Sequence, residues 1–184
     1  MNEQTIVFFC GPDRCGKTQI AKELSRRLNV PYFKASSERD TFLSSRVERS
    51  ERFMYQLRYA DPRVFDLLSQ TGHSVVFDRG FPCEYAYSQV LKRKSDLELL
   101  FKMDEAWASL GAKVVFCYRS SYDNIVDDLD STIDSTVLRA LDEKYREFFA
   151  RSKCDHTHLN VDDEDLEREI REVVKFMNNV GEGH

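Results

Sequence analysis

Five short runs with strand-like sequence divide the chain, and stretches with helical spacing lie between them. The runs cover residues 5–10, 30–33, 73–78, 112–118 and 156–161, and the first, third and fourth are largely apolar. Within 18–28, apolar residues recur every three or four positions, which is typical of a helix packed on a sheet. Strands that alternate with helices predict a parallel sheet with helices on both faces. We therefore expect a three-layer α/β/α fold around a central parallel five-stranded sheet.

The helical stretches differ in length. We expect helices over 18–28, 47–70, 83–92, 96–110 and 135–151, and a last one opened by the acidic residues 162–165. Pro62 predicts a break or kink in the longest of these, because proline has no backbone N–H to donate. Residues 36–45 read as a polar connection and 179–184 as a frayed end.

The first apolar run ends in a glycine-bounded loop that matches the phosphate-binding P-loop pattern G-x-x-x-x-G-K-[ST]. Its residues are Gly11, Pro12, Asp13, Arg14, Cys15, Gly16, Lys17 and Thr18. Glycines let the backbone turn N–H groups toward an anion, the lysine reaches the outer phosphates, and the threonine hydroxyl can hold Mg²⁺. A helix that begins at Gly16 or Lys17 adds its positive dipole end. The alternative is a plain strand-to-helix turn with an incidental lysine.

Asp78 ends the third apolar run and is followed by Arg79. A buried parallel strand would deliver this carboxylate at its carboxyl edge, where it can face nucleotide and metal. Arg79 would be a forked clamp for an acceptor phosphate. In the alternative interpretation, Asp78 caps the next helix and Arg79 is a surface charge.

Composition indicates a soluble globular protein. The 184 residues are 41% hydrophobic and 32% charged, which fits one domain over 1–184. No apolar stretch is long enough to span a membrane and the first residues lack a signal-type core, so we expect a cytoplasmic protein without a membrane partner. The net charge of −5 gives no global basic footprint for nucleic acid.

The cysteines do not predict a disulfide framework or a zinc site, because they are odd in number and widely spaced. They are Cys10, Cys15, Cys83, Cys117 and Cys154. The two in apolar runs, Cys10 and Cys117, should be small buried hydrophobes. Cys15 is either a thiol activated by the loop or a small side chain tolerated within it.

Three segments resemble the thymidylate kinase family. The loop with Asp13-Arg14 at its centre resembles the subgroup that carries its catalytic arginine in the P-loop. Asp78-Arg79 followed by Ala86-Tyr87 resembles the family's D-R-Y…S…A-Y-Q segment, and residues 57–63 resemble its substrate-helix segment. The resemblance implies a P-loop NTPase fold with a short helical lid, ATP and Mg²⁺ as cofactors, and phosphoryl transfer to a thymidine-type deoxynucleotide such as dTMP.

The resemblance also implies roles for single residues. Asp13 would contact the deoxyribose or position the acceptor, and Arg14 would bridge the donor and acceptor phosphates. Arg79, with Tyr87 in the same segment, would hold the acceptor, and Asp78 would serve the metal or the attacking oxygen.

On the base side, the resemblance implies that Tyr59 stacks on a pyrimidine and Arg63 reads its edge. A core aromatic at Tyr59 and a surface charge at Arg63 stay open.

Departures from the family pattern fall on the acceptor side. Gly80 replaces a tyrosine, Cys83 replaces a serine, and Ser88 separates Tyr87 from its glutamine. The arginine motif that follows the family's second strand has no clean match, which leaves Lys34 or Arg39 as substitutes.

A lid is expected over about 119–138, where five aspartates occur and 120–138 hold no lysine or arginine. Phosphoryl transfer needs positive charge, which Lys17 and Arg14 can supply, with Arg119 and Arg139 at the edges of the stretch. The alternative is a solvated acidic loop.

A second kinase hypothesis is a phage-type enzyme that phosphorylates 5-hydroxymethyluracil in DNA. Basic residues at 46, 49, 52, 58 and 92–94 could follow a DNA backbone, or could form a solvated helix face. A regulatory GTPase would need an Asn-Lys-x-Asp motif, which the chain lacks. A non-catalytic nucleotide-binding module and a homodimer stay open.

Overall fold

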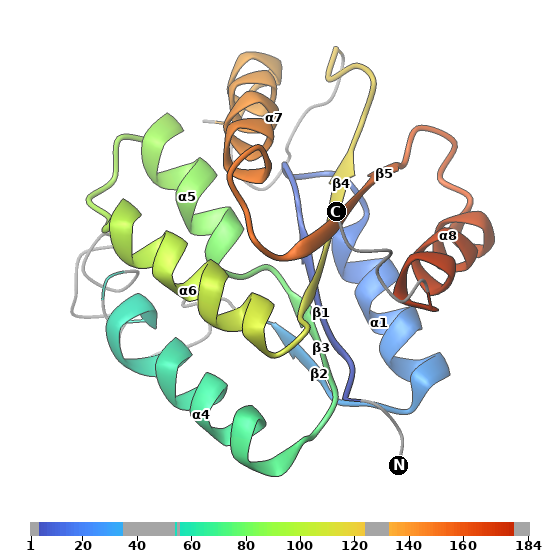
Figure 1. Cartoon of the computed structure of the whole chain (residues 1–184). Coiled ribbons are helices and arrows are strands. Elements are labelled where there is room, and N and C mark those ends of the chain that lie inside the picture. The colour runs from blue at the N-terminus through green and yellow to red at the C-terminus, as the bar shows by residue number, and fades with distance from the viewer. Residues whose placement is uncertain (1–3, 35–53, 55, 124–132, 179–184) are drawn as a thin grey trace, which may run out of the picture.

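A five-stranded parallel sheet forms the centre of the molecule, as the five runs predicted (Figure 1). The computed structural model describes residues 4–34, 54, 56–123 and 133–178. The strands are β1 (Ile6–Cys10), β2 (Tyr32–Lys34), β3 (Val75–Asp78), β4 (Lys113–Tyr118) and β5 (Asp155–Asn160). They lie in the order β2-β3-β1-β4-β5, so β1, which leads into the P-loop, is the central strand.

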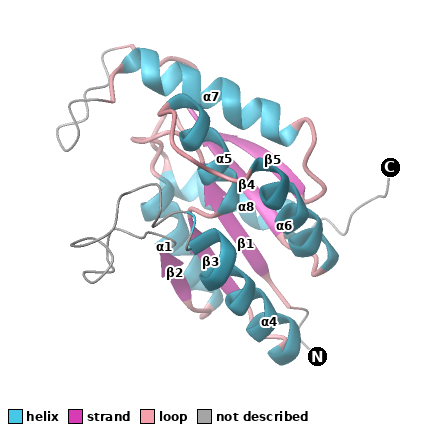
Figure 2. Ribbon diagram, turned by 90° about the vertical axis from the view of Figure 1, so that its left-hand side faces the viewer, coloured by secondary structure: helices cyan, strands magenta, loops and turns pink. Residues whose placement is uncertain are grey.

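Helices cover both faces of this sheet. They are α1 (Lys17–Leu28), α4 (Asp61–Thr71), α5 (Phe81–Val90), α6 (Leu97–Ser109), α7 (Ser135–Phe149) and α8 (Leu166–Asn178). In Figure 1, α1 and α8 lie on one side of the sheet and α4, α5 and α6 on the other. Figure 2 shows α7 near α5, against which it packs. The expected three-layer α/β/α architecture is confirmed.

The stretch expected as one helix over 47–70 differs in the structure. A π-helical turn, Gln56–Ala60, leads into α4, and Pro62 lies in the first turn of α4. Proline is tolerated there because the first N–H groups of a helix have no partner within it. The chain changes from π-helix to α-helix at Asp61, beside Pro62, where the sequence predicts a break or kink. The polar connection 36–45, the segment 47–53 and the end 179–184 lie outside the described residues.

An aromatic cluster anchors β1 and β3 beneath the helices. The rings of Phe8 and Phe77 stack with centroids 4.4 Å apart, and Trp107 of α6 packs edge-on against Phe8 at 5.1 Å. A Cβ at Gly80 would lie 2.7 Å from the Phe8 ring. A tyrosine therefore does not fit at position 80, which explains this departure from the family pattern.

All five cysteines are buried free thiols. Cys10 and Cys117 are small residues of the strand core, as predicted. Cys15 is also fully buried, and this burial raises its pKa despite the nearby Lys17. The interpretation of Cys15 as an activated thiol is wrong for this structure.

No helix within the described ranges is both long and apolar enough to cross a membrane.

Candidate active site

Strand register brings the P-loop and Asp78 to the same edge of the sheet. Phe9 on β1 is aligned with Asp78 at the end of β3, and Cys10 is aligned with Phe116 on β4. Because all these strands are parallel, the segments that follow them emerge side by side. Residues 11–16 form the P-loop at this edge.

The two glycines of the loop have backbone angles that side chains rarely adopt. Gly11 has φ of 138°, and a Cβ there would lie 2.0 Å from the carbonyl oxygen of Cys117. The Tyr145 hydroxyl donates to the carbonyl oxygen of Gly11 at 3.1 Å and fixes the loop to α7. Gly16 is left-handed with φ of 62°, and α1 begins at Lys17. The predicted turn and helix start are therefore confirmed.

Lys17 lies within the loop that precedes it. Its side chain is buried, and Nζ donates to the carbonyl oxygen of Pro12. The ammonium group is thus held against the loop whose glycine-bounded backbone is expected to receive phosphate.

Asp78 is completely buried, and only one of its two carboxylate oxygens is hydrogen-bonded within the described residues. Its Oδ2 accepts from the Thr18 hydroxyl at 2.6 Å and from the Tyr32 hydroxyl at 2.7 Å. Its Oδ1 has no hydrogen-bond partner among the described residues. A buried carboxylate oxygen left in this state is costly, and a cation would satisfy it. The donor set of Asp78 and Thr18 fits Mg²⁺.

Asp78 does not cap the following helix, so that alternative is wrong. The residue before α5 is Gly80, and no side chain caps this helix. The sequence predicts Tyr32 only as a strand residue and gives no signal for the hydrogen bond from its hydroxyl to Asp78.

Asp13, Arg79 and Tyr87 form a cluster on the other side of the loop. Arg79 Nη2 pairs with Asp13 Oδ1, and the Tyr87 hydroxyl donates to Asp13 Oδ2 at 2.6 Å. The guanidinium of Arg79 lies 5.3 Å from the centre of the Tyr87 ring. Burial acts to raise the pKa of Asp13, but Arg79, Lys17 and the Tyr87 hydrogen bond outweigh it and lower this pKa. Asp13 is therefore a firmly ionised carboxylate.

The sequence predicts that Asp13 and Arg79 each contact the acceptor. In the structure the two side chains pair with each other. The two residues are 66 positions apart and meet only because β1 and β3 are neighbours. Arg79 has a positive φ of 72°, and its backbone N–H donates to the Phe9 carbonyl oxygen at 2.9 Å.

Arg14 is exposed at the outer part of the loop, with φ of 63°. Its carbonyl oxygen accepts from Nε of Arg119 at 3.0 Å, and Arg119 also pairs with Glu164 at 2.6 Å. Arg119 therefore braces the backbone that carries Arg14.

The remaining residues predicted to bind the acceptor lie on β2, on α4 and in the π-helical turn before α4. Tyr59, in the π-helical turn, is 55% exposed, so the interpretation as a core aromatic is wrong. Arg63 is exposed on α4, and Lys34 is aligned with Asp78 at the end of β2. Arg39 lies outside the described residues.

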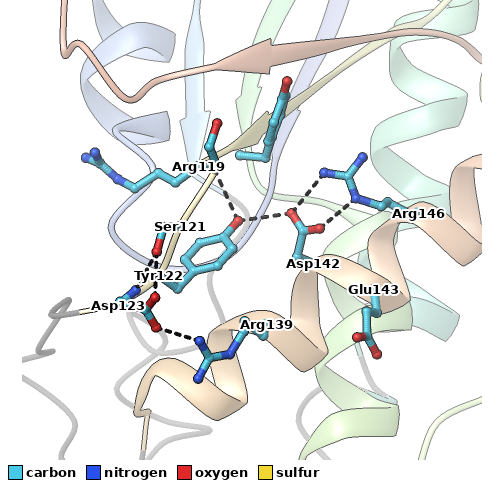
Figure 3. Close-up of a pocket in the computed structure, with 10 residues that line it drawn as sticks. Arg119, Ser121, Tyr122, Asp123, Arg139, Asp142, Glu143 and Arg146 are labelled. Atoms are coloured by element: carbon cyan, nitrogen blue, oxygen red, sulfur yellow. Dashed lines mark hydrogen bonds and ion pairs between the residues drawn. The ribbon is translucent and has the colours of Figure 1, made fainter.

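A polar hollow of about 330 Å³ lies beyond β4, between residues 118–123 and α7 (Figure 3). Arg119 and Arg139, expected at the edges of a lid, both line it. Arg139 pairs with Asp123 at 2.6 Å, and the Tyr122 hydroxyl donates to Asp142 at 3.0 Å. The central part of the expected lid, 124–132, lies outside the described residues.

Comparisons with known proteins give a fold but no family. No family model matches the sequence, and a search of curated proteins also finds no match. Thymidylate kinase from Ehrlichia chaffeensis is a structural neighbour with a TM-score of 0.66, 15% identity, and coverage of 95% of this chain and 99% of that one.

Two further solved structures agree with this neighbour. The YorR protein from Bacillus subtilis, solved in complex with phosphorylated GDP, has a TM-score of 0.64 and 18% identity, covering 93% of this chain and 94% of that one. Deoxyadenosine kinase from M. mycoides has a TM-score of 0.58 and 18% identity, covering 96% and 100%. This chain has the fold of the P-loop kinases.

Proposed function

We propose that this protein is an ATP-dependent kinase that transfers the γ-phosphoryl group to a thymidine-type deoxynucleotide, with dTMP as the first candidate. One observation carries the proposal: a complete P-loop presents Arg14 outward and Asp13 toward Arg79, directly beside the Thr18–Asp78 pair. A module that only binds nucleotide does not need a cation at the transferring phosphoryl group.

On the donor side, the loop amides and Lys17 bind the phosphates of ATP. Thr18 and Asp78 hold Mg²⁺, which neutralises charge on the phosphate oxygens when bound. Arg14, braced by Arg119 through its carbonyl oxygen, stabilises the transferring group.

On the acceptor side, Arg79 holds the phosphate of the nucleotide. The ion pair with Asp13 and the packing of Tyr87 fix the direction of its guanidinium, so the acceptor can be aligned for in-line attack. Tyr59, in the π-helical turn before α4, and Arg63, on α4, are both exposed and would contact the base. Lys34 supplies positive charge from β2.

The DNA alternative has less support. Arg93 is buried beside Glu84 and so is not available to follow a backbone, whereas Arg58, which pairs with Asp96 at 3.2 Å, is 53% exposed. Lys92 and Lys94 are also exposed. The arginines at 46, 49 and 52 lie outside the described residues. The test below includes hydroxymethylated DNA as an acceptor and so decides between the two hypotheses.

The test is a transfer screen with γ-labelled ATP and Mg²⁺. The acceptors are the four deoxynucleoside monophosphates, thymidine, and DNA with or without 5-hydroxymethyluracil, and Lys17→Ala is the negative control. Label on dTMP supports the proposal. Label on hydroxymethylated DNA but not on dTMP overturns the choice of acceptor, and ATP binding without transfer to any acceptor overturns the kinase assignment.

A further inference from the structure

Tyr32 reaches the carboxyl edge of the sheet from the edge strand β2. Its backbone is aligned with Val76, two residues before Asp78 on β3. Two strand residues span about 6–7 Å, an offset that only a long side chain can bridge. The Tyr32 hydroxyl bridges it and donates to Asp78 Oδ2 at 2.7 Å. The tyrosine ring therefore ends on a completely buried carboxylate at the centre of the site.

The ring of Tyr32 is itself held in place by α1. Tyr32 is half-buried, and the ammonium group of Lys22 lies 5.8 Å from the centre of its ring. Lys22 and Thr18 are four residues apart on α1 and so share a face of that helix. The same face thus supplies the Thr18 hydroxyl to Asp78 and a cation to the ring that supplies the other hydroxyl.

Both hydrogen bonds fall on the same oxygen of Asp78. Oδ2 accepts from Thr18 at 2.6 Å and from Tyr32 at 2.7 Å, whereas the buried Oδ1 has no partner among the described residues. The terminal torsion of an aspartate is soft, so a single donor leaves the carboxylate free to turn. Two donors from different elements, α1 and β2, fix which oxygen faces the protein and which is left over.

A purely structural aromatic residue does not need this hydroxyl. A phenylalanine would fill the same space between α1 and β3, and it would spare the protein a polar group at this edge. The hydroxyl has an effect only through Asp78, whose carboxylate and the Thr18 hydroxyl form the donor set that fits Mg²⁺. Hydrogen bonds to the ligands of a metal orient those ligands and tune their affinity.

We propose that Tyr32 is a positioning residue for Asp78, whose Oδ2 it holds so that Oδ1 is left for the cation. This inference rests on the proposed function, in which Thr18 and Asp78 hold Mg²⁺. Tyr32 acts through Asp78 and does not touch nucleotide or metal in this account. Its removal should therefore weaken the effect of Mg²⁺ and leave binding of the phosphates by the P-loop unchanged.

The test is the dissociation constant of a non-hydrolysable ATP analogue, measured by calorimetry with saturating Mg²⁺ and again in EDTA. The ratio of the two constants reports the coupling between metal and nucleotide without any catalysis. Tyr32→Phe keeps the ring and removes the hydroxyl, and it should weaken binding with Mg²⁺ by about tenfold. In EDTA the change should stay within about twofold, because the loop amides and Lys17 still bind the phosphates.

Tyr85→Phe is the matched control. The Tyr85 ring packs against Phe101 and Phe148, and Asp78 accepts no hydrogen bond from it within the described residues. This variant should leave both dissociation constants unchanged. Measurement at about 15 °C, near the usual temperature of maximum stability, keeps a destabilised variant folded, and thermal unfolding verifies this for each protein.

A double-mutant cycle with Asp78→Asn tests whether Tyr32 acts through Asp78. If it does, adding Tyr32→Phe to Asp78→Asn should change the Mg²⁺ effect by less than about twofold, because coupled residues are not additive. Additive losses would overturn the inference. So would equal weakening with Mg²⁺ and in EDTA, which indicates a merely structural role, or a Tyr32→Phe variant that behaves as the wild type.

These measurements are independent of the acceptor and of turnover. If the transfer screen finds no kinase activity but the cycle still couples Tyr32 to Asp78 in the Mg²⁺ effect, the proposed function fails and the positioning role stands. If Asp78→Asn leaves the Mg²⁺ effect intact, Asp78 is not a ligand and the inference about Tyr32 falls with it.

Discussion

One methyl group added at Gly11 tests how tightly the P-loop is held between the strands. In Gly11→Ala the new Cβ would lie 2.0 Å from the carbonyl oxygen of Cys117, whereas real Cβ contacts essentially never fall under 3.0 Å. The gap must therefore open by at least the 1.0 Å between these two distances. Cys117 is fully buried in β4 and aligned with Leu159 on β5, so the sheet resists this movement.

Two effects set the size of the loss. Inserting a methyl group into a packed region costs about 1–3 kcal/mol. Holding an alanine at φ of 138° costs about 1–3 kcal/mol more. We expect the free energy of unfolding of Gly11→Ala to fall by about 2–6 kcal/mol.

Gly111→Ala is the matched control. Gly111 also has a positive φ, of 70°, but a Cβ there meets nothing within 4 Å, so only the backbone cost of about 1–2 kcal/mol applies. Urea unfolding followed by circular dichroism measures both variants, and a difference of about 2–3 kcal/mol should separate their midpoints by about 1 M. If Gly11→Ala is as stable as Gly111→Ala, the close approach of the P-loop to β4 does not exist as described.

Three further predictions concern the site. Tyr87→Phe removes the 2.6 Å hydrogen bond to Asp13. It should lower kcat/KM for the acceptor about 10–100-fold, because a hydrogen bond to a charged group is worth about 1.5–3 kcal/mol. A similar rise in KM for ATP would show that the effect is not confined to the acceptor side. Asp78→Asn should raise the Mg²⁺ concentration for half-maximal transfer about tenfold, and an unchanged magnesium titration would argue against this ligand. The pKa of Glu84 is about 7 in the fold against an ordinary 4.5, so folding favours its protonated form and stability should fall as pH rises between these values; unfolding at pH 5 and pH 8 should show Glu84→Gln free of that loss.

The central strands could be predicted from the sequence because buried parallel strands are nearly continuous apolar runs. The run 112–118 corresponds to Lys113–Tyr118, whereas the edge strand β5, Asp155–Asn160, is mostly polar and only its Leu159 is buried. The P-loop could be predicted equally well from the sequence, because Gly11, Gly16 and Lys17 lie within one short segment. Features of this kind need no knowledge of the neighbouring strands.

The contacts between segments could not be predicted in the same way. Asp13 meets Arg79, and Asp78 meets Tyr32, only through the order and register of β1, β2 and β3. The sequence contains no pattern that specifies such pairs.

Glu84 did have a signal in the sequence. It is the only charged residue in α5, a helix otherwise made of uncharged and mostly apolar or aromatic residues, which indicates an acid that the fold has to bury.

The most direct test of the account is the effect of Arg14→Ala on turnover and on ATP binding, measured on the same preparation. If Arg14 acts on the transferring phosphoryl group, kcat with the best acceptor should fall by about 10³-fold or more, as for other arginines in this role. The dissociation constant for ATP should change by no more than about threefold, because Lys17 and the loop amides still bind the phosphates. A kcat within about tenfold of the wild type would contradict the assignment of this loop as a catalytic one.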